Sequence, residues 1–180
     1  MNIDAVVFDL YDTLVDTDSV TTECERVFAG EGATFSRTWR IKQLEYTWLL
    51  NSMGTYLDFH EVTLRAMIAS CRSMRLDCDS ETERSLLNAY LQLRPFSDVE
   101  PALKEIGFCV DRLGVLSNGT PQMLDNVLQS SDLKNYFSGV FSVESVRVYK
   151  PNPKVYRLAT ERLDLPPRNI GFVSANSWDI

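Results

Sequence analysis

Residues 7–14 read VFDLYDTL, so that an aspartate, Asp9, follows directly after a short apolar run. Three similar apolar runs come later, at residues 113–116, 140–143 and 170–173, and each is also followed by polar or small residues. Runs of this kind are typical of strands buried on both faces of a parallel sheet, where ligands bind at the carboxyl ends of the strands. The position of Asp9 therefore favours a nucleophile in a crevice at this edge, although an aspartate there can also simply cap a turn.

Helical segments lie between the later apolar runs. Thr120 with Pro121, and Asn152 with Pro153, each combine an N-cap residue with a proline in the first turn, which is a helix start signal. Alternation of strands and helices is typical of an α/β fold with a doubly wound, Rossmann-like parallel sheet. We predict that fold class.

The first two apolar runs are widely separated. About 100 residues lie between them, far more than the roughly 30 residues of a plain βαβ unit. The intervening sequence is strongly helical, with an apolar stripe at helical spacing through residues 41–49. We therefore predict a helical cap over residues 16–94, inserted into a core domain made of residues 1–15 and 95–180.

Composition excludes several classes of protein. The 180 residues include 18 Lys and Arg against 25 Asp and Glu, a net charge of −7, and so lack the cationic surface that a nucleic-acid partner requires. No apolar run reaches the roughly 18 residues that span a bilayer, and the N-terminus lacks a signal-peptide pattern. The four cysteines form no CxxC pair, which predicts reduced, mostly buried thiols in a cytoplasmic protein. His60, the only histidine, is expected to be structural or on the surface.

The polar residues at the four strand ends occur in a definite order. Along the chain they are Asp9, then Ser117 and Asn118, then Lys150, then Ser174, Asn176 and Asp179. This pattern resembles the haloacid dehalogenase superfamily, whose four motifs occur in the same order on such a sheet. Residues 39–49, WRIKQLEYTWL, are similar to the cap helix of its L-2-haloacid dehalogenases, and the resemblance extends from residue 3 to the last residue.

Two positions favour carbon–halogen cleavage over phosphoryl transfer. Phosphatases of the superfamily carry a second aspartate two residues after the nucleophile, to protonate the leaving alcohol; here that position is Tyr11. A halide needs no general acid. The last motif supplies one carboxylate, Asp179, where the phosphatases bind Mg²⁺ through several, so neither a metal nor another cofactor is implied.

The resemblance implies a role for each main group. Asp9 attacks C2 of the haloacid and displaces halide in an SN2 step. Arg40 lies over the leaving halogen, where a guanidinium stabilises the departing anion. Lys150 keeps Asp9 ionised, since an opposite charge nearby lowers the pKa of a carboxyl. Asp179, with help from Lys150, assists a water that hydrolyses the Asp9 ester, and inversion at C2 gives the D-2-hydroxy acid.

Other site residues implied by the resemblance surround these groups. Thr13, Ser174 and Asn176 orient the nucleophile and the water, and Tyr156 positions the water or the neighbouring lysine. Ser117, with nearby backbone N–H groups, holds the substrate carboxylate. The wall of the halogen and alkyl pocket comprises Tyr11, Leu44, Phe59, Asn118 and Trp178.

Two residues depart from the family pattern. Asp12 stands where these dehalogenases usually carry glycine, and an aspartate there would raise the pKa of Asp9 if it faced inward. Ile41 follows Arg40 where glutamine is common, which alters the polarity of the pocket.

The leading hypothesis is therefore an enzyme, a hydrolase of short L-2-haloalkanoic acids, with a small 2-halocarboxylic acid as its partner. The resemblance also implies a homodimer through the cap, with Trp48 and Leu49 in the core or the subunit interface. Two alternatives stay open: a phosphatase of the superfamily that uses Asp12 as its acid, and a catalytically impaired fold that acts as a binding module.

The resemblance leads us to expect a C-terminally truncated dehalogenase. Family members usually continue past the last motif with another strand and helices, whereas Asp179 is the penultimate residue here. A chain end of this kind is expected to fray, and one edge of the sheet is expected to be unprotected.

Overall fold

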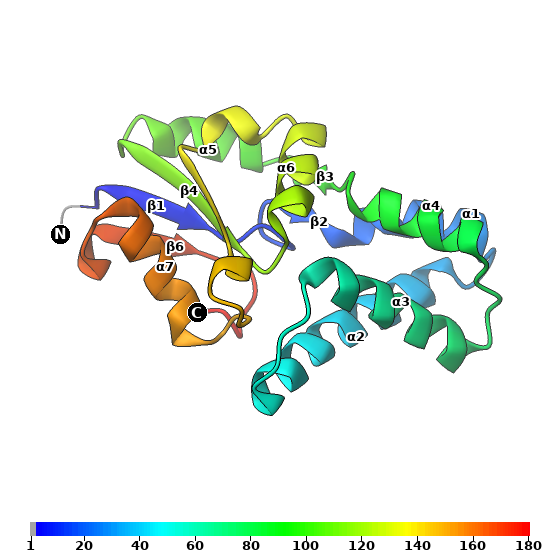
Figure 1. Ribbon diagram of the computed structural model, residues 1–180. Coiled ribbons are helices and arrows are strands. Elements are labelled where there is room, and N and C mark those ends of the chain that lie inside the picture. Colours follow the sequence, from blue (N-terminus) through cyan, green and yellow to red (C-terminus); the bar gives the residue numbers. More distant parts are fainter. Residues whose placement is uncertain (1–2) are drawn as a thin grey trace.

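The computed structural model describes residues 3–180 and contains a four-stranded parallel sheet. The strands are β1 (Ala5–Phe8), β4 (Arg112–Ser117), β5 (Gly139–Ser142) and β6 (Ile170–Val173), in the order β5-β4-β1-β6. The predicted doubly wound α/β fold is confirmed (Figure 1). β1 lies in the interior of the sheet, which is the position with a strand end on each side.

The register of the sheet brings the strand ends to one edge. Phe8, the last residue of β1, lies beside Val115 of β4 and Val173 of β6. Asp9 and Ser174 therefore leave the sheet side by side, and the backbone N–H of Asp9 donates a hydrogen bond to the carbonyl oxygen of Val173 at 2.9 Å.

Three helices cover the faces of the sheet: α5 (Val99–Gly107) and α6 (Pro121–Ser130) on one face and α7 (Pro153–Leu163) on the other (Figure 1). Two of them start as the sequence predicts. The Thr120 side chain accepts a hydrogen bond from the N–H of Met123 at 3.2 Å, and the Asn152 side chain accepts one from the N–H of Lys154 at 3.0 Å. Such caps satisfy backbone donors that a helix start otherwise leaves unpaired. Three short 3₁₀ helices complete this half of the molecule: η2 (Lys134–Tyr136), η3 (Val143–Ser145) and η4 (Pro167–Asn169).

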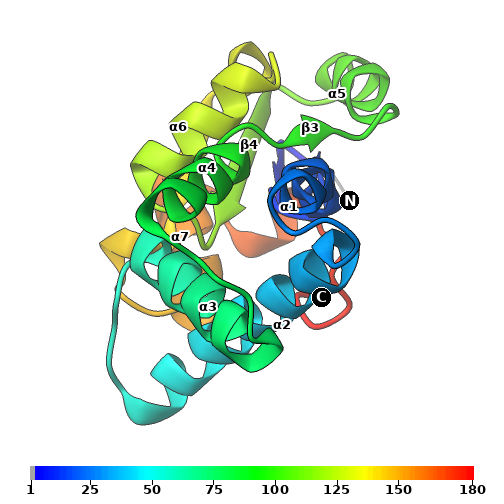
Figure 2. The ribbon, with the colours of Figure 1, turned by 90° about the vertical axis from the view of Figure 1, so that its right-hand side faces the viewer.

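The chain leaves and re-enters the sheet region through a short antiparallel ribbon of β2 (Val15–Asp16) and β3 (Arg94–Pro95). Everything regular between these strands is helical. The elements are η1 (Thr17–Val20), α1 (Thr21–Val27), α2 (Gly32–Met53), α3 (Phe59–Met74) and α4 (Ser80–Tyr90). Figure 2 looks onto these helices with the sheet behind them.

The apolar stripe predicted on α2, with Trp48 and Leu49 in the core or the subunit interface, does not lie in the core of the single chain. Ile41 is 59% exposed, Trp48 41% and Leu49 47%. The buried row of α2 is instead Phe35, Trp39, Gln43, Thr47 and Leu50. Polar members are tolerated in that row because they are paired: the side-chain amide of Gln43 donates to Thr63 at 2.7 Å, and the hydroxyl of Thr47 donates to the carbonyl of Leu44 at 2.7 Å.

The two outer strands are not buried on both faces, contrary to expectation. Val140 of β5 and Val173 of β6 are each 41% exposed, because an edge strand has a neighbour on one side only.

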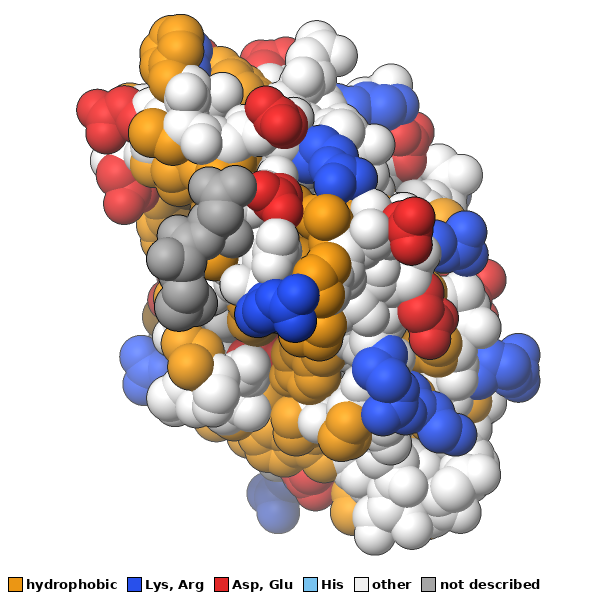
Figure 3. Space-filling view, turned by 90° about the vertical axis from the view of Figure 1, so that its left-hand side faces the viewer, with side chains coloured by type: hydrophobic (Ala, Val, Ile, Leu, Met, Phe, Trp, Pro, Cys, Tyr) orange, Lys and Arg blue, Asp and Glu red, His pale blue; other side chains and the backbone are white. Residues whose placement is uncertain are grey.

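On the face of the molecule at the left of Figure 1, acidic and basic side chains are interspersed around an apolar stripe (Figure 3). Within residues 3–180, no helix is both long and apolar enough to cross a membrane.

Candidate active site

The carboxylate of Asp9 is the centre of a buried hydrogen-bonded cluster at the end of β1. Asp9 is 4% exposed. One oxygen, Oδ1, accepts a hydrogen bond from Nζ of Lys150 at 2.9 Å. The other, Oδ2, accepts from the amide of Asn176 at 2.8 Å and from the hydroxyl of Thr13 at 3.3 Å. Both oxygens are thus oriented by donors from three separate segments.

Lys150 joins Asp9 to a second carboxylate. Its Nζ lies 2.8 Å from Oδ2 of Asp179, and the lysine side chain is 1% exposed. Oδ1 of Asp179 accepts a hydrogen bond from the hydroxyl of Tyr156 on α7. Asp179, expected on a loose chain end, is 5% exposed and held by two donors. A buried ammonium between two carboxylates offsets part of the cost of burying each of them.

The loops after β1 and β6 hold one another in place. The hydroxyl of Thr13 accepts a hydrogen bond from the N–H of Ala175 at 3.0 Å, and the amide of Asn176 also donates to the carbonyl of Tyr11 at 3.0 Å. The buried Ser174 hydroxyl accepts from the N–H of Asn176 at 3.2 Å. Ser174 therefore positions Asn176 and makes no recorded bond to Asp9.

Burial and charge oppose each other at Asp9. Burial raises the pKa of Asp9 above its ordinary value, and the charge and hydrogen bond of Lys150 lower it without cancelling that rise. The negative charge of Asp179 adds to the rise. Burial, together with the bond to Asp179, also raises the pKa of Tyr156, so its hydroxyl remains a donor. The cluster therefore depends on Lys150 to keep Asp9 charged.

The loop after β4 approaches the cluster through the backbone of Lys150. Oδ1 of Asn118 accepts a hydrogen bond from the N–H of Lys150 at 3.0 Å. Ser117 is fully buried, and its hydroxyl accepts from the N–H of Gly119 at 3.4 Å. Both predicted residues thus lie beside the cluster.

Arg40 lies where α2 meets the strand ends, but its guanidinium already has an anionic partner. Its Nε and Nη2 donate to Oδ2 of Asp12 at 3.0 and 2.7 Å. Burial would lower the pKa of Arg40, but Tyr90 and Asp12 raise it more, so Arg40 remains a cation. Asp12 also accepts from the hydroxyl of Thr17 and therefore faces Arg40 rather than Asp9.

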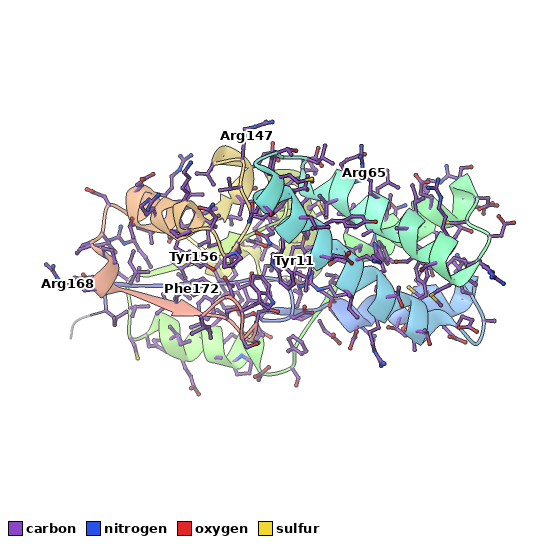
Figure 4. All side chains as sticks on the ribbon, turned by 90° about the horizontal axis from the view of Figure 1, so that it is seen from below. Tyr11, Arg65, Arg147, Tyr156, Arg168 and Phe172 are labelled. Carbon is purple, nitrogen blue, oxygen red and sulfur yellow. The ribbon has the colours of Figure 1, made fainter. Side chains whose placement is uncertain are left out.

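The predicted aromatic wall is only partly one cluster. The ring of Tyr11 packs against Phe59 with centroids 5.5 Å apart, and the Arg40 guanidinium lies 5.9 Å from its centre. Trp178 instead meets Trp48 of α2 edge-on at 5.8 Å, and Leu44 is half-buried on the same helix. Figure 4 shows Tyr11 near the middle of the molecule and Tyr156 of α7 beside Phe172 of β6, with Arg65, Arg147 and Arg168 at the periphery.

Within the described part of the chain, the hydroxyl of Tyr11 is a buried hydrogen-bond donor without an acceptor. Among residues 3–180 it is the buried side-chain polar atom for which the structure records no hydrogen-bond partner. Burial raises its pKa well above the ordinary value, so it stays protonated. It faces Gly119: a Cβ added there would come within 2.9 Å of the hydroxyl oxygen. An unpaired buried donor is costly, and a bound ligand with an acceptor oxygen or a halide would satisfy it.

Two residues of the site were missed by sequence reasoning. Oε1 of the fully buried Gln43 accepts from Nη1 of Arg40 at 2.6 Å and from the hydroxyl of Tyr90 at 2.8 Å. Gln43 is three residues after Arg40 and four after Trp39 on one helix, a spacing that places it beside both. This helical spacing was the one feature of the sequence that could have identified Gln43 as a neighbour of Arg40. Tyr90 lies 47 residues further along the chain, and no local pattern connects it to the site.

The arrangement defines a class of enzyme. An oriented carboxylate, a buried ammonium and a second carboxylate beside a tyrosine are the components of nucleophilic attack followed by base-assisted hydrolysis. The residue two positions after the nucleophile, Tyr11, carries no carboxyl group. In the part of the chain that the structure describes, no group of three or more His, Cys, Asp or Glu residues could hold a metal ion. The geometry is that of a hydrolase with an aspartate nucleophile.

Comparisons with known proteins agree with this class. The family model of the haloacid dehalogenase-like hydrolases matches residues 3–180. The (S)-2-haloacid dehalogenase of Pseudomonas putida is 43% identical over 99% of this chain and 78% of its own length, and that of Pseudomonas sp. strain YL is 44% identical over 98% and 76%. The L-2-haloacid dehalogenase of Xanthobacter autotrophicus, in its structure with chloropropionic acid covalently bound, superposes with a TM-score of 0.93 at 38% identity, over 98% of this chain and 71% of that one. The chain belongs to the haloacid dehalogenase-like hydrolase family.

Proposed function

We propose that this chain hydrolyses short L-2-haloalkanoic acids to D-2-hydroxy acids. The observation that carries the proposal is the buried Asp9–Lys150–Asp179 chain, with 2.9 and 2.8 Å between the lysine nitrogen and the two carboxylates. The dehalogenases at 43 and 44% identity, and the related structure with a covalently bound chloropropionic acid, support it.

In the first step a carboxylate oxygen of Asp9 attacks C2 of the substrate. A C2–O bond forms, the carbon–halogen bond breaks, and the halide leaves with the bonding electrons. Arg40 and the spare hydroxyl of Tyr11 are the donors that receive the halide or the substrate carboxylate. Ser117 and nearby backbone N–H groups, at the end of β4, hold the substrate carboxylate.

In the second step a water attacks the carbonyl carbon of the Asp9 ester. Asp179 accepts the proton of that water, and Lys150 and Tyr156 hold Asp179 in place. The ester carbonyl–oxygen bond breaks, and the oxygen bound to C2 takes the proton held by Asp179 and leaves as the hydroxyl of the hydroxy acid. The second proton of the water passes to solvent, which regenerates the Asp9 carboxylate. Thr13 and Asn176 orient the carboxylate in both steps.

The phosphatase alternative is not favoured. It requires Asp12 to protonate a leaving group beside Asp9, but the Asp12 side chain is directed toward Arg40 and Thr17 rather than toward Asp9.

The proposal predicts that the purified protein releases chloride from L-2-chloropropionate, with the D-enantiomer as the matched control. Activity is expected to be the same in EDTA and in Mg²⁺, because no step uses a metal. Mg²⁺-dependent hydrolysis of a chromogenic phosphate ester without chloride release would instead assign the phosphatase. If neither reaction occurs but the cap helices mediate dimerisation or ligand binding, the binding-module alternative holds.

We further propose that residues 16–94 form the cap of the site and that two copies associate through it. A groove between α2 and α3 is lined by the apolar side chains of Leu49, Met53, Leu57 and Ile68 and also by charged residues such as Lys42 and Arg65. Met53 is 64% exposed. The four cysteines are free thiols, two of them buried, which fits the cytoplasm as the proposed location.

For the dimer, light scattering is expected to give twice the mass of the 20.5 kDa chain. Leu49→Glu should yield a monomer, because the substitution would bury a charge where the proposed interface has an apolar side chain. Phe108→Glu, an equally drastic change at a 91% exposed position, is the control. A wild-type monomer would rule out this assembly.

A further inference from the structure

The guanidinium proposed to receive the halide is already paired with a carboxylate of the same chain. Two of the five N–H groups of Arg40 point at Oδ2 of Asp12, and a third points at Oε1 of Gln43. An incoming anion therefore meets a cation whose charge is largely compensated.

Asp12 is held firmly in this position. Its backbone has φ of +63°, a conformation in which aspartate and asparagine are the better tolerated non-glycine residues. Its N–H donates to the carbonyl of Val15 at 2.8 Å, and its Oδ1 accepts from the hydroxyl of Thr17. The side chain is directed by the turn and by Thr17 toward α2.

With Asp12 included, the charged residues of the site carry a net negative charge. Lys150 and Arg40 contribute two positive charges, and Asp9, Asp12 and Asp179 contribute three negative ones. An anionic substrate must enter a cluster that is already negative by one unit. Without the charge of Asp12 the cluster would be neutral.

We propose that Asp12 is a built-in counter-ion of Arg40 that weakens the binding of halide and of substrate carboxylate, and so sets the affinity of the site for anions. This inference rests on the proposed role of Arg40. The same compensation lets the product halide leave quickly. Asp12 is accordingly a residue that determines affinity rather than one that reacts.

The test compares Asp12→Asn with wild type, using bromide as the probe. Asparagine keeps the size of the side chain and tolerates positive φ, but removes the charge. Asp16→Asn is the matched control: it removes an equal charge four residues away, where the side chain caps η1 by accepting from the N–H of Asp18 and makes no recorded ion pair with Arg40. Bromide affinity is measured without substrate, from thermal melting in sodium bromide against sodium gluconate at equal ionic strength.

We expect Asp12→Asn to bind bromide about tenfold more tightly, because a unit charge within a few ångströms of a partly buried site has an effect of at least this size. The KM for L-2-chloropropionate should fall by a similar factor, with kcat changed less than about threefold. Asp16→Asn should match wild type, and Arg40→Met should lose bromide binding.

Bromide affinity of Asp12→Asn that is unchanged or weaker than that of wild type would overturn the proposal, since Asp12 would then serve only to position Arg40. Should Asp12→Asn fail to fold, Asp12→Gly provides the same comparison, because glycine adopts positive φ freely. The bromide measurement needs no turnover. It therefore decides this inference even if the protein releases no halide and the proposed function fails.

Discussion

Replacing Asp9 by asparagine is expected to reduce halide release by about 10⁴-fold, the scale of loss when a nucleophile is removed. An amide oxygen is a poor nucleophile for carbon, and Asn176, Thr13 and Lys150 cannot replace it because they only donate hydrogen bonds to it. The initial rate of chloride release from L-2-chloropropionate measures the effect.

The control for this variant is Asp98→Asn, an exposed aspartate whose side chain makes no capping bond to α5. It should retain wild-type activity, and circular dichroism should show both variants folded. If Asp9→Asn kept a tenth or more of the wild-type rate, the covalent mechanism would have to be abandoned.

Replacing Lys150 by methionine is expected to lower the free energy of unfolding by about 3–5 kcal/mol at pH 7 and to abolish most of the activity. Methionine fills the volume of the lysine stem but leaves Asp9 and Asp179 buried without their shared cation. Urea denaturation measures the stability. Lys154→Met, on the exposed first turn of α7, is the control and should be near neutral.

The pH dependence of the Lys150→Met variant gives a second measurement. The pKa of Asp9 is already raised by burial, and loss of Lys150 removes the group that opposes the rise. A carboxyl whose pKa is higher in the folded state binds more protons there, so stability increases as the pH falls through that pKa. The stability deficit of Lys150→Met should therefore be smaller at pH 5 than at pH 7. A deficit below about 1 kcal/mol, or one independent of pH, would show that the cluster is not coupled as described.

The cluster of polar side chains at the strand ends was predictable because the carboxyl ends of parallel strands all lie at the same edge of the sheet. Asp9 and Asn118 follow a strand directly, Asn176 comes three residues after β6 and Lys150 eight residues after β5. Parallel strands bring such positions to one edge of the sheet. The order of the residue types along the chain was therefore sufficient to place them together.

The helical part of the site was less predictable for a physical reason. On α2 the buried row includes Gln43 and Thr47, so hydrophobicity alone does not identify the face that packs in the core of the single chain, where Trp48 and Leu49 are exposed. The pairing of Arg40 with Asp12 depends on a single backbone conformation, φ of +63°, which a sequence pattern does not contain. Contacts between polar side chains that are distant in the sequence depend on backbone conformations of this kind.

The central claim is that an oxygen of Asp9 becomes the hydroxyl oxygen of the product. A single turnover in H₂¹⁸O, with enzyme in excess over L-2-chloropropionate, tests it by mass spectrometry of the product and of the peptide that contains Asp9. We expect unlabelled D-lactate and one ¹⁸O atom in the Asp9 carboxylate, because the water attacks the ester carbonyl and not C2. Label in the lactate and none in Asp9 would contradict the account.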